Sequence, residues 1–464
     1  MKNKAIFSFL FFYVLVAIFT ICYFDGTGDS GDSIFHYQHA RYAPQHPHIF
    51  FNHWAKPLYV LLFSPWAQFG FIGVKIFNAL IVFFTLFFTF KITEKLTIKN
   101  AILSPVLLLF SPLFYILTFS GLTEPLFALM LSIGIYAILK DKYTFAAILI
   151  SFLPFVRSEG LLIAAVFGLF FLLKKRWQVL PWLTAGHIVY SIAGSFVHEN
   201  LLWVFKKIPY DKLSSLYGNG GLTDFIIKMN YVVGVPIYAL FWIGVISIIW
   251  KSIKQKLKLE LQILVFIGFF VFFIAHSLFW YLGIFNSMGL KRVLISVLPL
   301  SAIIALMGFN WITEDLLSYK KTLKLFFQSI LILLVLIFPF TPNPAAINWS
   351  KDMQLIPDQV EAIQVVKAVK DKLGDNNRFI YVHPYLSEVL QIDHFDYKKH
   401  IPFRKNYLDE VRSGDIIIWE AWFSVVEFGI TQKSLDKNSQ LENIYRSSSK
   451  TKASGISFAA YRVK

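Results

Sequence analysis

The chain has 464 residues, of which 56% are hydrophobic, 18% aromatic and only 16% charged. A water-soluble protein carries roughly 25% charged residues, and a single soluble core could not bury the 50 phenylalanines present here, so the composition excludes an ordinary soluble protein. The formal net charge of +16 raises the question of nucleic-acid binding. The basic residues flank apolar runs, however, which favours contact with anionic membrane lipids and no nucleic-acid partner.

The first apolar run, over residues 5–23, follows a short basic segment and has the outline of a signal peptide. The run is too long for one, and no small-x-small cleavage pattern precedes the polar residues that begin at Asp25. We therefore expect a retained first helix. The single cysteine, Cys22, lies in this run, so no intrachain disulfide can form.

Apolar runs recur along the chain, and several approach the roughly 20 residues that a membrane-spanning helix needs. Inside lipid the backbone must satisfy its own hydrogen bonds, so each run is predicted to be a helix. The segment 57–68 is apolar but short, and we expect it to be re-entrant or interfacial. The predicted spans, about eleven of them, cover residues 5–23, 71–90, 101–118, 125–139, 143–156, 160–173, 178–196, 230–250, 261–283, 293–309 and 325–341.

Lysine and arginine indicate the orientation of these spans, because cytoplasmic loops carry an excess of both. When the N-terminus is placed in the cytoplasm, most basic residues of the connections fall on the cytoplasmic side, although the outer loops are longer in total. An odd number of spans then puts the C-terminus outside. The first outer loop covers residues 24–56.

The composition changes to ordinary polarity after the last span. We therefore divide the chain into a transmembrane domain over 1–344 and a small extracytoplasmic α/β domain over 345–464. The expected elements of the second domain are a helix over 357–373 and strands over 378–382, 415–419 and 456–462. The predicted fold class is mainly α, a polytopic helical bundle that carries this α/β domain.

Carboxylates gather in the first outer loop, where Asp25, Asp29 and Asp32 lie close together beside the membrane face. Such a group could act as a general base or bind a metal. The alternative is a solvated turn rich in glycine and aspartate.

Other charged residues are predicted on the same outer side. Glu124 opens one span, Arg157 and Glu159 lie between two spans, and Arg292 precedes another. Carboxylates beside cations suit a reaction in which an acceptor hydroxyl loses a proton and a phosphate leaves. A purely local Arg157–Glu159 pair, or snorkelling of Arg157 to the headgroups, is the alternative.

These stretches resemble a known family. Asp32-Ser-Ile-Phe-His-Tyr-Gln-His-Ala-Arg41, followed by Lys56-Pro57, resembles the first loop of the GT-C membrane glycosyltransferases. Those enzymes use lipid-phosphate sugar donors and include the protein O-mannosyltransferases and the aminoarabinose transferases of lipid A. Three further stretches are similar to the family's Glu-Pro, Arg-x-Glu-Gly and late-Arg motifs: Glu124-Pro125, Arg157-Ser-Glu159-Gly160, and Lys291-Arg292 ahead of a span with Pro299.

The resemblance implies roles for individual residues. Asp32 would deprotonate the acceptor; because Ser33 stands where many members have Glu, Asp29 is the alternative base. By the same resemblance, the donor phosphate would be held by Lys56, Arg157 and Arg292. Four further residues are predicted to contact substrate: Glu124, Glu159, His36 and His53.

Histidines are dense in the first outer loop, and His36 and His39 could share a helix face as zinc ligands. No cysteine joins them, so we predict no metal site and no cofactor, with a divalent metal as the alternative. The segment Tyr217-Gly-Asn-Gly-Gly221 lacks the Lys-Ser/Thr of a phosphate loop and is predicted to be an outer turn, or a lid over the site.

The sequence therefore predicts an inverting glycosyltransferase in a membrane, with a bacterial inner membrane as the expected location. It would move a sugar, mannose being one candidate, from a polyprenyl phosphate to a glycan, lipid or protein acceptor at the periplasmic or exterior face, and the C-terminal domain could bind the acceptor. A transporter or lipid flippase is the rival, because Pro154 and Pro236 interrupt spans. A non-catalytic relative that binds carrier lipid is the third possibility.

Overall fold

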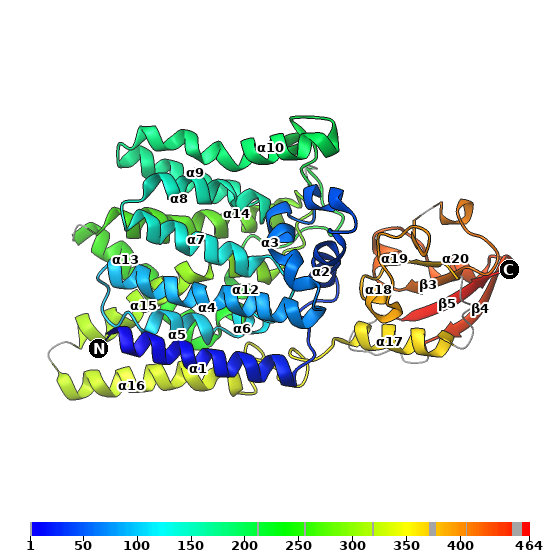
Figure 1. Ribbon diagram of the computed structural model, residues 1–464. Coiled ribbons are helices and arrows are strands. Elements are labelled where there is room, and N and C mark those ends of the chain that lie inside the picture. The colour runs from blue at the N-terminus through cyan, green and yellow to red at the C-terminus, as the bar shows by residue number, and fades with distance from the viewer. Residues whose placement is uncertain are drawn as a thin grey trace.

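A bundle of helices carries a small β-sheet domain at one end in the computed structural model (Figure 1). The structure describes residues 2–210, 213–254, 257–317, 320–370, 377–404, 406–447 and 457–464. The end of the predicted helix, 371–373, and the start of the last predicted strand, Ile456, lie outside the described residues. The N-terminus and the sheet domain lie at opposite ends of the bundle (Figure 1).

Six segments are long and apolar enough to cross a membrane among the described residues: Lys4–Tyr23, Phe71–Lys95, Val235–Lys254, Leu261–Leu282, Lys291–Leu316 and Lys321–Phe340. Four apolar helices are shorter: Pro57–Ala67, Glu124–Ile138, Tyr143–Phe155 and Gly160–Leu173. These helices make the chain an integral membrane protein, and the number of eleven spans stays a prediction.

The helical elements of the bundle follow the apolar runs closely. They are α1 (Lys2–Tyr23), α4 (Phe71–Lys95), α5 (Leu103–Leu109), α6 (Pro112–Leu117), α7 (Glu124–Ile138), α8 (Tyr143–Ser151), η2 (Leu153–Phe155), α9 (Gly160–Leu173), η3 (Trp177–Thr184), α10 (Ala185–His198), α11 (Trp203–Lys206), α12 (Asp224–Val233), α13 (Val235–Lys254), η4 (Leu261–Ile267), α14 (Gly268–Leu282), η5 (Lys291–Val297), α15 (Leu298–Asn310), η6 (Trp311–Leu316), α16 (Lys321–Ile337) and η7 (Phe338–Phe340).

The run predicted as one span over 101–118 consists instead of α5 and α6. The break falls at Pro112, the first residue of α6, because proline has no N–H to donate to the preceding turn. The run predicted over 178–196 is likewise divided between η3, which contains Pro181, and α10.

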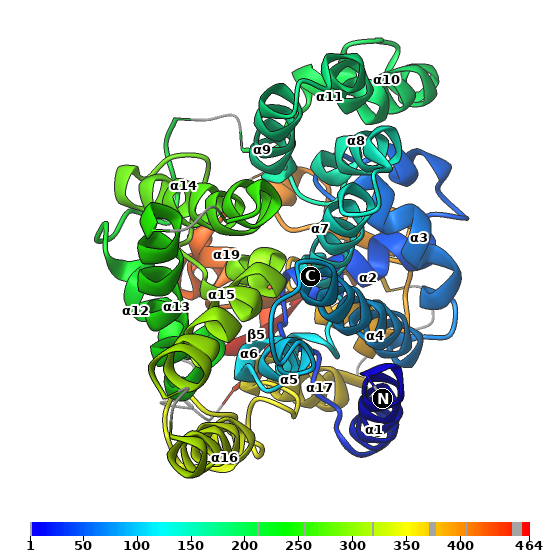
Figure 2. The same cartoon turned by 90° about the vertical axis from the view of Figure 1, so that its left-hand side faces the viewer.

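Burial distinguishes the centre of the bundle from its rim. The α15 segment is buried along its whole length, whereas α1 and α16 expose most of theirs; Figure 2 shows α15 surrounded by other helices and the other two at the edge. Helix α15 packs against α13 at a point where both helices have glycine. A Cβ on Gly244 would meet the backbone of Ile304, and a Cβ on Gly308 the backbone of Leu240, so small residues permit this close approach.

The first outer loop folds into short helices at the sheet end of the bundle. They are α2 (Asp32–Tyr42), η1 (Pro47–Phe51) and α3 (Pro57–Ala67). The segment predicted to be re-entrant or interfacial is α3, and it packs against α2 and α4. These elements stand between the bundle and the sheet domain (Figure 1).

The sheet domain has five strands in the order β2-β1-β3-β5-β4, with β1 parallel to β2 and β3, and β5 antiparallel to β3 and β4. Apolar residues cover both faces of the sheet. Its elements are α17 (Pro357–Val369), β1 (Phe379–Tyr381), α18 (Tyr385–Leu390), β2 (His400–Pro402), η9 (Tyr407–Asp409), β3 (Ile416–Glu420), α19 (Phe423–Val426), α20 (Gln432–Asp436), β4 (Leu441–Arg446) and β5 (Phe458–Val463). The predicted fold class, a helical membrane bundle with a small C-terminal α/β part, is confirmed.

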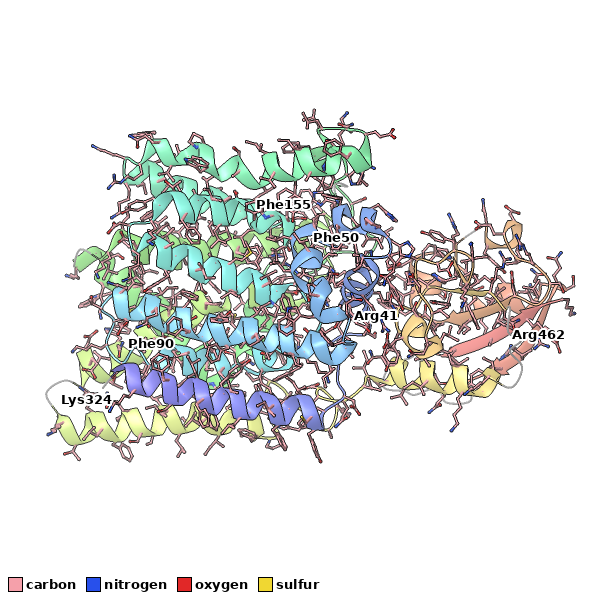
Figure 3. The ribbon with its side chains drawn as sticks, viewed as in Figure 1. Arg41, Phe50, Phe90, Phe155, Lys324 and Arg462 are labelled. Carbon is pink, nitrogen blue, oxygen red and sulfur yellow. The ribbon has the colours of Figure 1, made fainter. Side chains whose placement is uncertain are left out.

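The second half of α2 contacts the sheet domain at the start of α18 and within it. Gln38 Nε2 donates to the carbonyl oxygen of Pro384 at 2.6 Å, and Arg41 Nη1 lies 3.2 Å from Glu388 Oε2. Figure 3 shows Arg41 at this boundary, with Lys324 at the opposite end of the bundle. The sheet domain is therefore bound to the first outer loop through side chains that the loop presents.

Candidate active site

Two aspartates of the first outer loop share one arginine. Arg292, in η5, places Nη1 2.6 Å from Asp29 Oδ2 and donates from Nη2 to Asp32 Oδ2. Asp32 is the first residue of α2, where a carboxylate stabilises the positive end of the helix. Asp29 Oδ1 accepts from the N–H of Gly31 at 2.7 Å. Residues far apart in the sequence thus hold both carboxylates in fixed positions.

Glu124 joins this group to a second arginine. Arg157 Nη1 lies 2.8 Å from Glu124 Oε1, and Arg292 Nε lies 3.7 Å from the same oxygen. Arg157 Nη2 also donates to Glu159 Oε1 at 2.9 Å. The result is one continuous series of ion pairs with alternating charge, the carboxylate–arginine chain. It runs from Asp29 and Asp32 through Arg292, Glu124 and Arg157 to Glu159.

Lys56 lies beside this chain with its backbone in the left-handed region, at φ +67°. Its Nζ donates to Ser158 Oγ at 3.3 Å and lies 5.7 Å from the ring centre of Tyr210. The side chain is buried, and among the described residues it has no carboxylate within ion-pair distance. It is the one cation of this site without such a partner in the described part of the chain. Burial lowers the pKa of Lys56 to about 8, against the opposing charge of Glu159.

The two aspartates are pushed apart in pKa. Burial raises the pKa of Asp29 above its usual range, although Arg292 opposes it, and the nearby charge of Asp32 adds to the rise. Burial acts on Asp32 as well, but Arg292, through its charge and its hydrogen bond, holds the pKa of Asp32 below its usual range. Asp32 is therefore ionised at neutral pH.

Comparison with protein-family models and with curated proteins finds no match. Two solved structures match almost the whole chain. One is the crystal structure of ArnT from Cupriavidus metallidurans bound to undecaprenyl phosphate, with a TM-score of 0.62, 10% identity, and 98% of both chains covered. The other is the same protein in the apo state, with a TM-score of 0.58, 9% identity, and coverage of 98% of this chain and 97% of that one.

The chain has the GT-C fold. ArnT is a GT-C glycosyltransferase, and the match extends from the first helix to the sheet domain. The likeness inferred from short motifs of the sequence is confirmed at the level of the fold. At 10% identity the match does not carry over what ArnT does or which of its residues act.

Six of the residues predicted for the site make up the carboxylate–arginine chain of this GT-C fold, and Lys56 stands next to them. His36 lies close by, stacked on Trp54 with ring centres 5.2 Å apart. Burial lowers the pKa of His36 to about 3, so the ring is neutral, and its buried Nδ1 has no hydrogen-bond partner among the described residues.

His53, also predicted for the site, lies outside the carboxylate–arginine chain. Its Nε2 lies 3.2 Å from the carbonyl oxygen of Val204, and its ring packs against Trp203. It lines an open cavity of about 520 Å³ together with His48, Asn52, Trp54, Val197, His198, Lys207 and Pro209. Trp54 belongs both to this cavity and to the stack on His36, so the cavity begins beside the site.

Three residues near the carboxylate–arginine chain were not predicted from the sequence. Ser158 and Tyr210 contact Lys56, and His276 Nε2 lies 3.4 Å from Glu159 Oε1. His276 had a usable signal, because an ionisable residue in the middle of an apolar run indicates a functional site. Tyr210, in a long outer connection, had none.

No group of three or more His, Cys, Asp or Glu side chains that could hold a metal ion occurs among the described residues. The prediction that no metal or cofactor is needed stays a prediction. The segment predicted as an outer turn or lid is held by the bundle, where Gly220 N–H donates to the carbonyl oxygen of Trp280 at 3.2 Å. Tyr217 of the same segment donates from its hydroxyl to Glu427 Oε1 of the sheet domain at 3.4 Å.

Proposed function

We propose that the protein is an inverting glycosyltransferase that moves a sugar from a polyprenyl phosphate to an acceptor hydroxyl at the non-cytoplasmic face of a membrane. The observation that carries the proposal is the joint presence, in one site, of an ionised carboxylate on Asp32 and a buried ammonium on Lys56 that has no carboxylate within ion-pair distance in the described part of the chain. The carboxylate can accept the proton of the acceptor hydroxyl, and the ammonium can bind the phosphate of the donor.

The reaction follows from these two groups. The acceptor oxygen attacks the anomeric carbon from the face opposite the phosphate, which inverts the configuration, and the bond from that carbon to the phosphate oxygen breaks. The proton of the acceptor hydroxyl passes to a carboxylate oxygen of Asp32, and the electron pair of the broken bond leaves on the phosphate. Because the pKa of Asp32 is low, it is a weak base and takes the proton late, when the attacking hydroxyl has become acidic.

The three cations of the site have different roles. Nη1 and Nη2 of Arg292 are both used by Asp29 and Asp32, so binding a phosphate there would break existing ion pairs. We assign the first phosphate contact to Lys56, whose ammonium balances the charge that develops on the leaving group. Arg157 keeps its Nε without a hydrogen-bond partner among the described residues, and this N–H is available for a second contact.

The lipid carrier is supported by two considerations. Nucleotide sugars are cytoplasmic, whereas the charge distribution of the sequence predicts that this end of the bundle faces the other side, so a lipid-linked donor is the expected source. ArnT, which shares this fold, has been crystallised with undecaprenyl phosphate. We propose that this chain takes a polyprenyl phosphate of the same kind.

The experiment is a transfer assay with purified protein, candidate lipid-linked sugars and detection of released polyprenyl phosphate. Asp32→Asn should abolish release, by about 10²- to 10⁴-fold, the usual contribution of a general base. The matched control is Asp25→Asn, the third aspartate of the same loop, which lies outside the carboxylate–arginine chain and should keep wild-type activity. Thermal unfolding of both variants checks that they fold.

Full activity of Asp32→Asn would refute its assignment as the base. Movement of the lipid across a vesicle membrane without release of polyprenyl phosphate would favour a flippase instead. Binding of the lipid-linked sugar with neither outcome would identify a non-catalytic carrier-lipid-binding protein.

A further inference from the structure

The segment that carries Asp29 and leads into Asp32 is bound on its other side by the sheet domain. The N–H of Gly26 donates to the carbonyl oxygen of Met353 at 2.9 Å, and Gln359 Nε2 donates to Thr27 Oγ1 at 2.9 Å. Ser30 Oγ donates to Asp358 Oδ2 at 2.5 Å. Two of these contacts join Thr27 and Ser30 to the start of α17, whereas Met353 lies just before α17 and packs in the core of the bundle.

Asp358 is itself paired within the sheet domain. His383 Nε2 lies 3.2 Å from Asp358 Oδ2, the same oxygen that accepts from Ser30, and the N–H of Gln359 donates to Asp358 Oδ1. Asp358 is 5% exposed and His383 is fully buried. A buried carboxylate is stable only when its oxygens are hydrogen-bonded. His383 and the N–H of Gln359, both in the sheet domain, hold Asp358 in place, and its contact outside this domain is with Ser30.

Aromatic rings pack against His383 of the Asp358–His383 pair. His383 packs edge-on against Phe423 and Phe458, with ring centres 5.6 and 5.5 Å away. The ring of Phe423 also faces the segment itself, because a Cβ on Gly31 would come within 3.3 Å of it. Gly31 lies between Ser30 and Asp32, so the sheet domain supports the segment at two consecutive residues.

The segment is thus held from two directions. Arg292 binds Asp29 and Asp32 from the bundle, and Asp358 binds Ser30 from the sheet domain. Removing either support would leave the carboxylates free to turn, and a displacement of about 1 Å at a reacting group lowers a rate about 10²-fold.

We propose that the sheet domain positions the two active-site aspartates through the contact of Ser30 with the Asp358–His383 pair. This inference rests on the proposed function, because it assigns positioning residues to that same site. Ser30, Asp358 and His383 touch no reacting atom; they fix the place from which Asp32 meets the acceptor. The sheet domain is then part of the active site, in addition to any contact that it makes with the acceptor.

A docking contact without any role in positioning is the alternative, and the interface offers a matched control for it. Arg41 and Glu388 also join α2 to the sheet domain, 3.2 Å apart, but near the other end of α2 and with about 30% of each side chain exposed. Glu388→Gln removes an interface carboxylate just as Asp358→Asn does. Only Asp358→Asn removes one that contacts the segment before Asp32.

The kinetic arm of the test uses the transfer assay with Ser30→Ala, Ser30→Thr, Asp358→Asn and Glu388→Gln. Ser30→Ala and Asp358→Asn should lower kcat about ten-fold or more, the effect of losing a hydrogen bond to a charged group, while KM for the donor is unchanged. Ser30→Thr, which keeps the hydroxyl, should recover most of the rate. Glu388→Gln should stay within about two-fold of wild type, as expected for an exposed pair.

A second arm measures hydrogen–deuterium exchange of the backbone amides of 24–31 in the full-length protein. Exchange should be faster in Ser30→Ala and Asp358→Asn and unchanged in Glu388→Gln. Equal losses of kcat in Asp358→Asn and Glu388→Gln would overturn the inference, and so would faster exchange with normal kcat. If the wild-type protein transfers no sugar, the proposed function fails, and exchange alone then decides whether the sheet domain holds the segment.

Discussion

Replacing Lys56 with methionine should weaken the binding of a polyprenyl phosphate while leaving the carboxylate–arginine chain in place. Methionine keeps the length and most of the apolar surface of lysine and removes only the charge and its three donors. Lys56 has no ion-pair partner among the described residues, so its loss leaves no buried carboxylate without a counter-charge there. A change in affinity would therefore report on the phosphate and not on the fold.

The expected magnitude comes from the burial of the ammonium. Lys56 is 8% exposed, so its contact with a phosphate oxygen would be a charge-assisted hydrogen bond largely shielded from solvent. Such a bond contributes about 1.5–3 kcal/mol, which corresponds to about a 10- to 100-fold change in Kd. A surface lysine would give less than one kcal/mol.

The pKa of Lys56 adds a pH dependence whose sign is fixed. An ordinary lysine keeps its proton up to about pH 10.4, but the pKa of Lys56 is about 8. Below pH 8 the ammonium is charged and binds phosphate; above it the charge is lost, so kcat/KM for the donor should fall as the pH rises through about 8. Lys56→Arg keeps a charge at all these pH values and should remove this alkaline limb.

The assay is a titration of a labelled polyprenyl phosphate into the protein in lipid nanodiscs, repeated across pH. Lys75→Met is the matched control, because Lys75 is also buried but donates to the carbonyl oxygen of Phe24 at 2.6 Å and belongs to no part of the site. Wild-type affinity in Lys56→Met, or an equal loss in Lys75→Met, would refute the assignment. So would an alkaline limb that persists in Lys56→Arg.

Two further predictions concern stability. Arg292→Gln should lower the free energy of unfolding by about 2–3 kcal/mol, somewhat less than for a fully buried pair because Asp29 and Asp32 are about one-third exposed, and a normal melting temperature would contradict the ion-pair geometry. Gly308→Val should cost about 1–3 kcal/mol by forcing α15 away from α13, whereas Gly168→Ala, where the nearest atom would be 3.5 Å from the new Cβ, should melt like wild type.

The members of the carboxylate–arginine chain could be predicted from the sequence for a physical reason. Charged residues at the ends of apolar runs cannot enter the lipid, so those predicted on one side of the membrane must share one end of the bundle. Glu124, Arg157 and Arg292 each stand at the start of a helical element or in the break before one. Their common end could therefore be predicted without knowing how the helices pack.

The ion pairs within the carboxylate–arginine chain could not be predicted, because they depend on which helices are neighbours. The sequence indicated an Arg157–Glu159 pair from proximity, but nothing in it indicated that Glu124 contacts Arg157 and Arg292 at once. The hydrogen bond of His53 could not be predicted for a related reason. His53 lies within reach of the charge of Lys56, but its Nε2 contacts the carbonyl oxygen of Val204, a residue far away in the sequence.

In the C-terminal part, the strands were easier to predict than the contacts with the first outer loop. Strands β1, β3 and β5 lie where alternating or apolar runs predicted them, while β2 and β4 pair at the edges of the sheet and carry weaker patterns. No pattern indicated that Asp358 would meet Ser30, because the two residues are 328 positions apart in the sequence.

The charge balance of the site bears on which aspartate is the base. The carboxylates of Asp29, Asp32, Glu124 and Glu159 outnumber the cations of Lys56, Arg157 and Arg292. An incoming phosphate adds negative charge and is accommodated best if one carboxylate takes a proton. Burial and the neighbouring charge of Asp32 raise the pKa of Asp29 while the pKa of Asp32 is lowered, so of these two aspartates Asp29 gains a proton first. Asp32 then stays ionised beside the bound donor, and this difference favours Asp32 over Asp29 as the group that accepts the proton of the acceptor.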